Sequence, residues 1–183
     1  MKYWIITDTH FEHYKIIDFC SRPSDYNDQI LRNLQCIQKD DILIHLGDVA
    51  WLNEKWWHLE FLKHLPCKTW LVRGNHDKRS DSWYLDVGWD FVGESIILNR
   101  FKKNILLSHI PQKDTGYDIN VHGHFHNLGK GWFSPKLSEI KNDKHVLIKI
   151  EHTYSPIKLK TIVENFNKEK SWKLEEPENF SLV

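Results

Sequence analysis

The amino-acid sequence predicts an α/β fold with a strand-rich second half, arranged as one mixed sheet or as two packed sheets. Three observations support this prediction. Short apolar runs with many β-branched residues end abruptly in small or polar residues, which is typical of strands. Segments with helical spacing separate the first three runs, and this strand, helix, strand order favours parallel crossovers. From about Asp90 onward the predicted elements are nearly all strands.

The first half alternates strands and helices. Its predicted strands are the apolar runs at residues 3–7, 42–46 and 69–72. One helix is predicted after Asp25 and another after Asn53, because both residue types favour helix starts, and Pro66 closes the second helix. The apolar positions that indicate these helices are Tyr26, Ile30, Leu34 and Ile37 in the first and Trp56, Leu59, Leu62 and Leu65 in the second.

The second half is predicted to hold further short strands and one helix. The strands are residues 95–99, 104–107, 119–121 and 145–151, and the helix is residues 159–166. We expect residues 129–144 to form a long surface excursion and the Lys- and Glu-rich residues from about 168 to 183 to fray. The length of 183 residues favours a single domain over residues 1–183.

Composition argues against several classes of protein. Lys and Arg together number 25, as do Asp and Glu, so the chain has no overall basic field for duplex DNA or an anionic membrane. The three widely spaced cysteines contain no CxxC pair, which argues against a disulfide framework or a thiolate zinc site. The apolar runs are too short for a signal core or a membrane helix. We therefore expect a soluble, cytoplasmic protein with no membrane partner.

The residues that follow the predicted strands carry the strongest functional signal. In open α/β sheets, functional side chains gather beyond the carboxyl ends of the strands. Imidazole and carboxylate ligands together favour Zn, Fe, Mn or Ni over Mg or Ca. Alternate residues of an extended DxH or HxH segment point the same way, so each pair could hold one ion. The residues at these strand ends are Asp8, His10, Asp48, Asn75, His76, Asp77, His109, His124 and His126.

The candidate ligands are too many for one ion, which suggests two ions that share a bridging carboxylate. Asp48 stands alone between the other groups and is the candidate bridge. Two divalent ions against Asp8 and Asp48 would leave a net charge of about +2, which would attract an anionic substrate. For any single one of the 12 histidines, a packed or surface role is the alternative.

Five short motifs follow one another along the chain: Asp8-x-His10, Gly47-Asp48, Gly74-Asn75-His76-Asp77, Ser108-His109 and Gly123-His124-x-His126. In this order they resemble the calcineurin-like metallophosphoesterase superfamily, in particular its small single-domain bacterial and phage members. The resemblance covers about residues 3–159. It implies an α/β fold of two facing mixed β-sheets flanked by helices, the αββα sandwich of this superfamily.

The resemblance also implies roles for individual residues. A hydroxide between the two ions would attack phosphorus in line, because bound metal can lower the pKa of water to about 7. His76 would be the general acid or a clamp on the phosphate, with a turn-capping histidine as the alternative. In this scheme Asp8, His10 and His126 hold one ion, Asn75, His109 and His124 hold the other, and Asp48 bridges them.

The chain departs from the protein phosphatases of this superfamily. Residues 47–52 lack the second Asp and the Arg of a GDxxDRG string, and this absence disfavours a protein phosphatase. Asp77 is a candidate to orient His76, or it only stabilises the turn. His13 and Arg22 could contact substrate phosphate, since Arg suits a bidentate contact, and ordinary loop and surface roles are the equal alternative.

These features predict a metal-dependent hydrolase of phosphate esters, with a phosphodiesterase of a small nucleotide-like substrate as the first hypothesis. We expect two divalent transition-metal ions, Mn²⁺ first, with Fe, Zn or Ni as alternatives. Trp51, Phe125 and Trp132 flank the predicted metal loops and could stack a base, although packing is the simpler role. The alternatives are a phosphomonoesterase or phosphoprotein phosphatase, a nuclease, which the neutral charge disfavours, and a non-catalytic interaction module, which the complete ligand set disfavours. The sequence indicates no oligomeric state.

Overall fold

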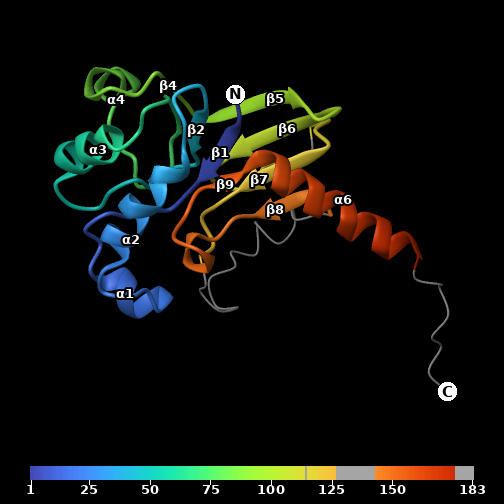
Figure 1. Ribbon diagram of the computed structural model, residues 1–183, viewed down its shortest axis with the longest axis horizontal. Helices are drawn as coiled ribbons and strands as arrows, with labels where there is room; N and C mark the ends of the chain where they lie inside the picture. Colours follow the sequence, from blue (N-terminus) through green and yellow to red (C-terminus); the bar gives the residue numbers. More distant parts are fainter. Residues whose placement is uncertain (114, 127–142, 176–183) are drawn as a thin grey trace.

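The computed structural model describes residues 1–113, 115–126 and 143–175, with side chains up to residue 169. Its strands form two sheets, one of five strands and one of four (Figure 1). The first sheet consists, in spatial order, of β4 (Phe91–Gly93), β3 (Lys68–Val72), β2 (Ile42–His45), β1 (Tyr3–Ile6) and β9 (Ile157–Lys158). The second consists of β5 (Ser95–Arg100), β6 (Lys103–Ser108), β7 (Ile119–His122) and β8 (His145–Leu147).

Both sheets are mixed. In the first, β9 is antiparallel to β1 and the other pairs are parallel. In the second, β5 is antiparallel to β6 and the other pairs are parallel. The prediction of an α/β fold with two mixed sheets and flanking helices is therefore confirmed.

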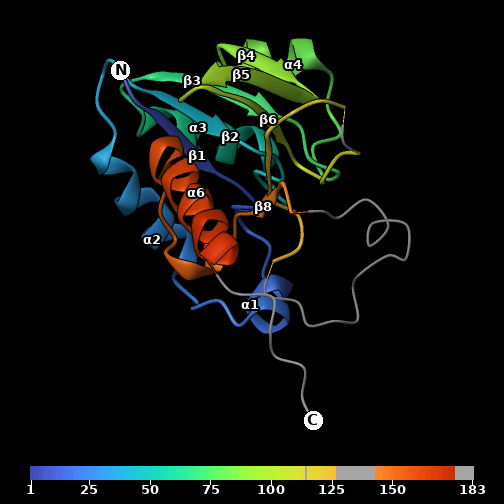
Figure 2. The same cartoon turned by 90° about the vertical axis from the view of Figure 1, so that its right-hand side faces the viewer.

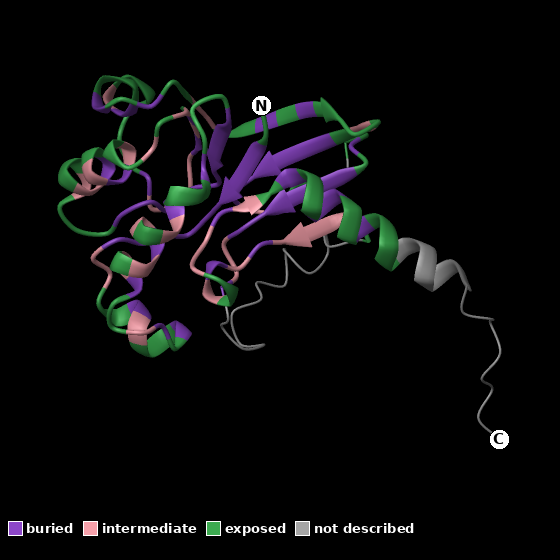
Figure 3. Ribbon diagram, viewed as in Figure 1, coloured by how far each residue is buried: buried purple, intermediate pink, exposed green. Residues whose placement is uncertain are grey.

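The sheets share one apolar core, and a second core lies under the helices. Ile5 and Ile44 point into the core between the sheets, whereas their neighbours Trp4 and Leu43 point toward the helices. This alternation follows from the strand geometry, in which successive side chains face opposite sides of the sheet. Strands buried on both faces explain the continuous apolar runs of the sequence (Figure 3).

Most of the helices cover the outer face of the first sheet. The helices α1 (Lys15–Cys20), α2 (Tyr26–Asn33), α3 (Glu54–Lys63) and α4 (Asp81–Val87) supply the second core. The helix α6 (Leu159–Glu175) instead adds its apolar side chains to the core between the sheets and packs against β1 and β9 (Figure 2). Short 3-10 turns follow α2 at η1 (Leu34–Cys36) and precede β9 at η3 (Ile150–His152).

The parallel register places the ends of the central strands at one edge. Ile6 pairs with His45, and His45 pairs with Leu71, so β1, β2 and β3 end side by side. In the second sheet Ser108 pairs with His122, so β6 and β7 also end together. The loops that carry the predicted ligands therefore start from adjacent strand ends.

The structure changes several predicted boundaries. The strand predicted over residues 145–151 ends at Leu147, and η3 follows it. The helix predicted over residues 159–166 continues to Glu175, so the first part of the segment expected to fray is helical. The elements α1, α4, β4 and β9 were not predicted. The surface excursion at residues 129–144 falls almost entirely outside the described residues, as does the tail beyond residue 175.

The buried face of α3 matches the predicted one only in part. The helix starts directly after Asn53, as predicted, and Leu62 and Leu65 are partly buried against the core. Trp56 and Leu59 are 55% and 47% exposed. The buried residues are His58 and Phe61, because Phe61 packs against Phe11 on the sheet side. Apolar type and helical spacing therefore predicted burial for two residues that lie on the exposed side of the helix.

Two expectations from composition can be compared with the structure. No disulfide joins the three cysteines, all of which are described. Within the described ranges, the helices are too short or too polar to cross a bilayer.

Candidate metal centre

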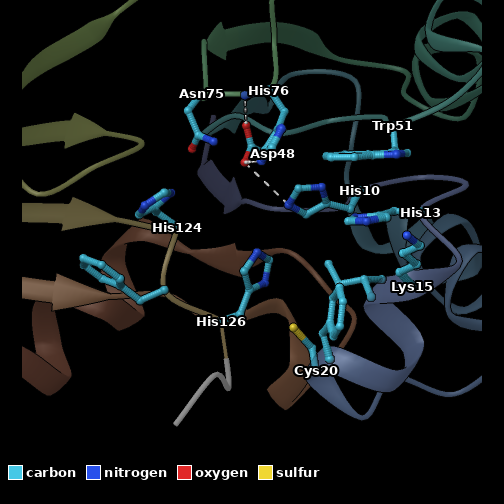
Figure 4. Close-up of a pocket in the computed structure, with 13 residues that line it drawn as sticks. His10, His13, Lys15, Cys20, Asp48, Trp51, Asn75, His76, His124 and His126 are labelled. Atoms are coloured by element: carbon cyan, nitrogen blue, oxygen red, sulfur yellow. Dashed lines mark hydrogen bonds and ion pairs between the residues drawn. The ribbon is translucent and has the colours of Figure 1, made fainter. Parts of the chain in front are cut away.

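The predicted ligands come together as two clusters at the edge where the strands end. Figure 4 shows four of these ligands: His10, Asp48, His124 and His126. In each cluster one ligand atom per residue lies within 4.8 Å of the others. The first cluster contains Asp8, His10 and His126, and the second contains Asp48, His109 and His124. Each cluster takes residues from both sheets, since the aspartates and His10 follow strands of the first sheet and the other histidines follow β6 and β7.

Asp8 holds one oxygen fixed and presents the other to the cluster. Its Oδ2 accepts hydrogen bonds from the Thr7 hydroxyl and, at 3.0 Å, from the backbone N–H of His124. Its Oδ1 is buried without a hydrogen-bond partner in the described part of the chain and lies 3.4 Å from His126 Nε2. A buried carboxylate oxygen without a donor is costly unless a cation or a proton satisfies it.

Asp48 repeats this arrangement between the two clusters. Its Oδ1 accepts a hydrogen bond of 2.8 Å from the backbone N–H of His76. Its Oδ2 lies 3.5 Å from His10 Nε2 in the first cluster and 3.3 Å from His109 Nε2 in the second. Burial alone would raise the pKa of Asp48, but the hydrogen bond and positive charge of His109 hold it below its usual range. The position fits the predicted bridge.

The tautomer of His109 suits a ligand role. Its Nδ1 lies 2.8 Å from the carbonyl oxygen of Leu46, and because a carbonyl only accepts, Nδ1 carries the proton. Its Nε2 then faces the cluster, at 2.9 Å from Asn75 Oδ1 and 3.1 Å from His124 Nδ1. Burial lowers the pKa of His109, but the Asp48 carboxylate outweighs this effect and raises it to about 9. A cation at this point would replace that proton.

The ligand loops are not extended, contrary to the reasoning from DxH and HxH spacing. Asp8 and His10 have φ values of 52° and 47°, and His124 and His126 have values of 76° and 36°. This left-handed region is unfavourable for residues with a Cβ, and it recurs at functional sites whose surroundings hold the strain. Backbone hydrogen bonds from Asp8 to Gly47 at 2.9 Å and from His10 to Asp48 at 3.0 Å hold the first loop.

Two glycines of the motifs make room for the carboxylates. A Cβ at Gly74 would overlap Asp48 Oδ1, and a Cβ at Gly123 would overlap Asp8 Oδ2. The glycines are therefore required by the close approach of the ligand loops.

The donor set fits divalent transition-metal ions. Imidazole nitrogens with a few carboxylate and amide oxygens are typical of Mn, Fe, Zn or Ni sites. The unsatisfied Asp8 Oδ1 and the position of Asp48 Oδ2 between two imidazoles indicate a need for positive charge at both clusters. The residues present thus fit the cofactor that the sequence predicts.

A cavity of about 400 Å³ opens beside the clusters (Figure 4). The predicted substrate contacts His13, Asn75 and His76 line it. The His13 ring stacks on Trp51, with ring centres 4.0 Å apart and an angle of 5° between the planes. Opposite them, α1 contributes an apolar wall that includes Ile16, Phe19 and Cys20. Phe125 also lines the cavity, and Trp132 lies outside the described residues.

The Asp77 carboxylate bonds to backbone N–H groups of two loops. It accepts hydrogen bonds from the backbone N–H groups of Asp48 at 2.7 Å, Val49 at 3.2 Å and Gly74 at 2.7 Å. Burial and the neighbouring Asp48 charge raise the pKa of Asp77 to about 6. These contacts favour the alternative, in which Asp77 stabilises the turn and the Asp48 loop.

Arg22 does not reach the substrate cavity. Its side chain is buried beneath the first cluster, where it donates to the backbone carbonyls of Asp8 and Thr9. The predicted bidentate phosphate contact is not supported, because the guanidinium hydrogens point to the protein interior. Both Arg22 and His126 contact Glu151, a residue that the sequence analysis missed. Glu151 belongs to no motif and lies in a short 3-10 turn, so no local pattern identifies it.

The comparisons with known proteins define the class. A family model described as calcineurin-like phosphoesterase matches residues 1–183, and the chain belongs to this family. It is therefore a metal-dependent hydrolase of phosphoesters. The chain is 31% identical over 183 residues to an uncharacterised protein of Methanocaldococcus jannaschii. The match covers 92% of this chain and 93% of the relative.

A solved structure of similar length supports the fold. A protein of unknown function from Aquifex aeolicus has a TM-score of 0.70 and 28% identity, over 90% of this chain and 98% of that chain. A Pseudomonas putida nuclease has a TM-score of 0.44 and 20% identity, over 67% of this chain and 60% of that chain. An archaeal phosphodiesterase has a TM-score of 0.44 and 21% identity, over 81% of this chain and 82% of that chain. At 0.44 neither of these likenesses supports an inference about substrate.

Proposed function

We propose that the chain is a phosphodiesterase that hydrolyses small nucleotide-like diesters at a dinuclear metal centre. The cavity beside the clusters carries this proposal. A diester keeps one alcohol group on phosphorus while the other leaves, so it needs space beside the phosphate site. The wall formed by Ile16, Phe19 and Cys20 supplies an apolar surface there, and Phe19 is 58% exposed at its rim. An exposed aromatic ring beside a phosphate site suits a nucleobase.

The two clusters would hold two divalent ions, with Asp48 in contact with both and Asn75 as a further ligand of the second. When bound, such ions supply positive charge to the phosphate oxygens and lower the pKa of water. Asp8 and Asp48 keep their ligand oxygens oriented through the backbone hydrogen bonds of their other oxygens. This preorganisation means that little rearrangement is needed when the substrate enters.

His76 is the proposed general acid. Its backbone N–H is fixed on Asp48, while its side chain is 38% exposed and lines the cavity. The ring lies 4.7 Å from that of Trp51, which limits its orientations. From this position it can donate a proton to the leaving oxygen of a substrate phosphate.

His13 is proposed to position the substrate as an uncharged ring. Burial lowers its pKa to about 4, so it is neutral at physiological pH. The residue lines the cavity, and its ring is held against Trp51. Such a group can orient a polar atom of the substrate but does not add charge to the phosphate site.

Steady-state hydrolysis tests the proposed reaction. With Mn²⁺, we expect kcat/KM for bis(p-nitrophenyl) phosphate to exceed that for p-nitrophenyl phosphate by about tenfold or more. Only the diester has a second aryl group that can pack against the apolar wall. A preference for the monoester would favour a phosphomonoesterase instead.

The nucleotide-like substrate is tested with two diesters that share a leaving group. We expect thymidine 5′-(p-nitrophenyl phosphate) to lose about tenfold in kcat/KM in Phe19→Ala, while methyl p-nitrophenyl phosphate changes less, because a stacked base contributes about 1–3 kcal/mol. Phe91→Ala is the matched control, since Phe91 is 42% exposed on β4 and outside the cavity lining. An equal effect of both variants would contradict the base position.

A further inference from the structure

A buried ion pair lies beneath the first ligand cluster. Arg22 Nη2 is 2.7 Å from Glu151 Oε1, and the two side chains are 0% and 1% exposed. Arg22 follows α1 and Glu151 lies in η3, so the pair joins two segments that are 129 positions apart in the sequence. A buried ion pair adds little net stability when hydrophobic residues could replace it, so its presence calls for another role.

Arg22 holds the loop that carries the first two ligands. Its Nη2 donates to the carbonyl oxygen of Asp8 at 2.8 Å, and its Nη1 donates to that of Thr9 at 2.9 Å. These bonds fix the backbone between Asp8 and His10, where the φ values are positive. The guanidinium thereby holds a strained ligand loop in place.

Glu151 holds the third ligand. Its Oε1 lies 2.8 Å from His126 Nδ1. Arg22 Nη2 lies 3.3 Å from the same nitrogen, but the shorter contact and the acceptor-only carboxylate place the proton on Nδ1. The lone pair of His126 is then on Nε2, which faces Asp8 Oδ1 at 3.4 Å. A carboxylate that fixes the tautomer of a ligating histidine in this way strengthens the ligand.

Glu151 Oε1 is the meeting point of the two supports. It accepts hydrogen bonds from Arg22 Nε at 3.1 Å and from Arg22 Nη2 at 2.7 Å, as well as from His126 Nδ1 at 2.8 Å. In the described part of the chain, no hydrogen bond or ion pair joins Arg22 or Glu151 to a side chain of the second cluster or to the neighbouring Asn75. The second cluster consists of Asp48, His109 and His124.

We propose that Arg22 and Glu151 are positioning residues for the metal ion of the first cluster alone. One ion pair supports all three ligands of that cluster, through the backbone carbonyls of Asp8 and of Thr9, which directly precedes His10, and through the tautomer of His126. The second ion is held without them. The inference rests on the proposed dinuclear centre and adds that its two positions depend on different supporting residues.

Metal titration of Glu151→Gln tests the inference. In calorimetry with Mn²⁺ after chelator treatment, we expect two binding steps in the parent protein. In the variant one step should weaken about 10- to 100-fold and the other should stay within about twofold. Glu164→Gln is the matched control, because Glu164 is 53% exposed on α6 and pairs with Lys160.

The outcomes separate the two proposals. A single binding step in the parent would contradict the dinuclear centre itself. Two steps in the parent with both unchanged in Glu151→Gln would overturn the positioning role, and equal weakening of both steps would indicate a general structural role instead.

Two further measurements keep the inference testable if Glu151→Gln folds poorly. Arg22→Lys keeps the charge but loses the planar pair of donors, and we expect it to weaken the same single step. Nitrogen NMR of the metal-free protein reports the tautomer of His126, which should be Nδ1-protonated in the parent and mixed in Glu151→Gln. An Nε2-protonated parent would overturn the proposed role of Glu151.

Discussion

At the scale of single residues, the centre depends on carboxylates of which only one oxygen is left available. Asp48 shows this most clearly, since Oδ1 is held by the His76 N–H and Oδ2 lies between imidazoles of both clusters. Asp77 supports the same loop through three backbone N–H groups. The backbone N–H of His76 and the carboxylate of Asp77 therefore hold Asp48 and its loop without competing for the metal positions.

His76→Ala distinguishes a general acid from a phosphate clamp. With thymidylyl-thymidine, whose leaving alcohol needs a proton, we expect the variant to lose about 100-fold or more in kcat. With thymidine 5′-(p-nitrophenyl phosphate), whose leaving group needs none, the loss should stay below about tenfold. Equal losses with both substrates would favour the clamp. His64→Ala, at an exposed helix end, is the control and should leave both rates unchanged.

Residue types in ordered motifs predicted the ligands, but the residues that support the ligands could not be predicted in this way. The positions of Asp8, His10, Asp48 and the later histidines follow strand ends, and strand ends are visible as the close of apolar runs. The direction of a hydrogen bond is not visible in a sequence. Arg22 and Glu151 are common surface residue types, and only the folded chain shows that they meet beneath a ligand loop.

At the scale of elements, burial on both faces made the central strands easy to predict. The short elements were missed because two or three residues, as in β9 and β4, carry no periodicity. The apolar face of α3 was predicted from type and spacing at Trp56, Leu59, Leu62 and Leu65, and only the last two pack against the core. The helix instead buries His58, whose Nδ1 accepts a hydrogen bond of 2.9 Å from Trp89 Nε1. A partner distant in sequence decided the orientation.

His58 makes the stability of the fold dependent on pH. Burial lowers its pKa to about 3, whereas it is about 6.5 in an unfolded chain. The unfolded state thus binds the proton more readily, so stability is complete above pH 6.5 and declines as the pH falls toward 3. At pH 4.5 the loss from this residue is about 2–3 kcal/mol.

Urea unfolding of the chelator-treated protein at pH 7 and pH 4.5 checks this expectation. His58→Gln keeps an acceptor for Trp89 but has no proton to bind. Its free energy of unfolding should therefore fall less between the two pH values than that of the parent, by about 2 kcal/mol. The same decline in both proteins would contradict the assignment.

At the scale of the whole molecule, the candidate metal centre connects the two sheets. Each cluster combines ligands that follow strands of the first sheet with ligands that follow β6 or β7 of the second. The shared core holds the sheets together from the inside, and bound ions would join them at the edge where the loops meet. Metal binding is therefore expected to stabilise the fold as a whole as well as to support catalysis.

Thermal unfolding with and without metal measures this contribution. At a metal concentration 100-fold above Kd, one site adds about 2.7 kcal/mol, and each kcal/mol raises Tm by about 2–4 °C in a chain of this size. We expect two ions to raise Tm by about 10 °C or more, and Asp48→Asn, which weakens both positions, to reduce that rise to a few degrees. Asp86→Asn on the exposed face of α4 is the control and should respond like the parent. If the metal-dependent rise were the same in Asp48→Asn, Asp48 would not belong to both sites.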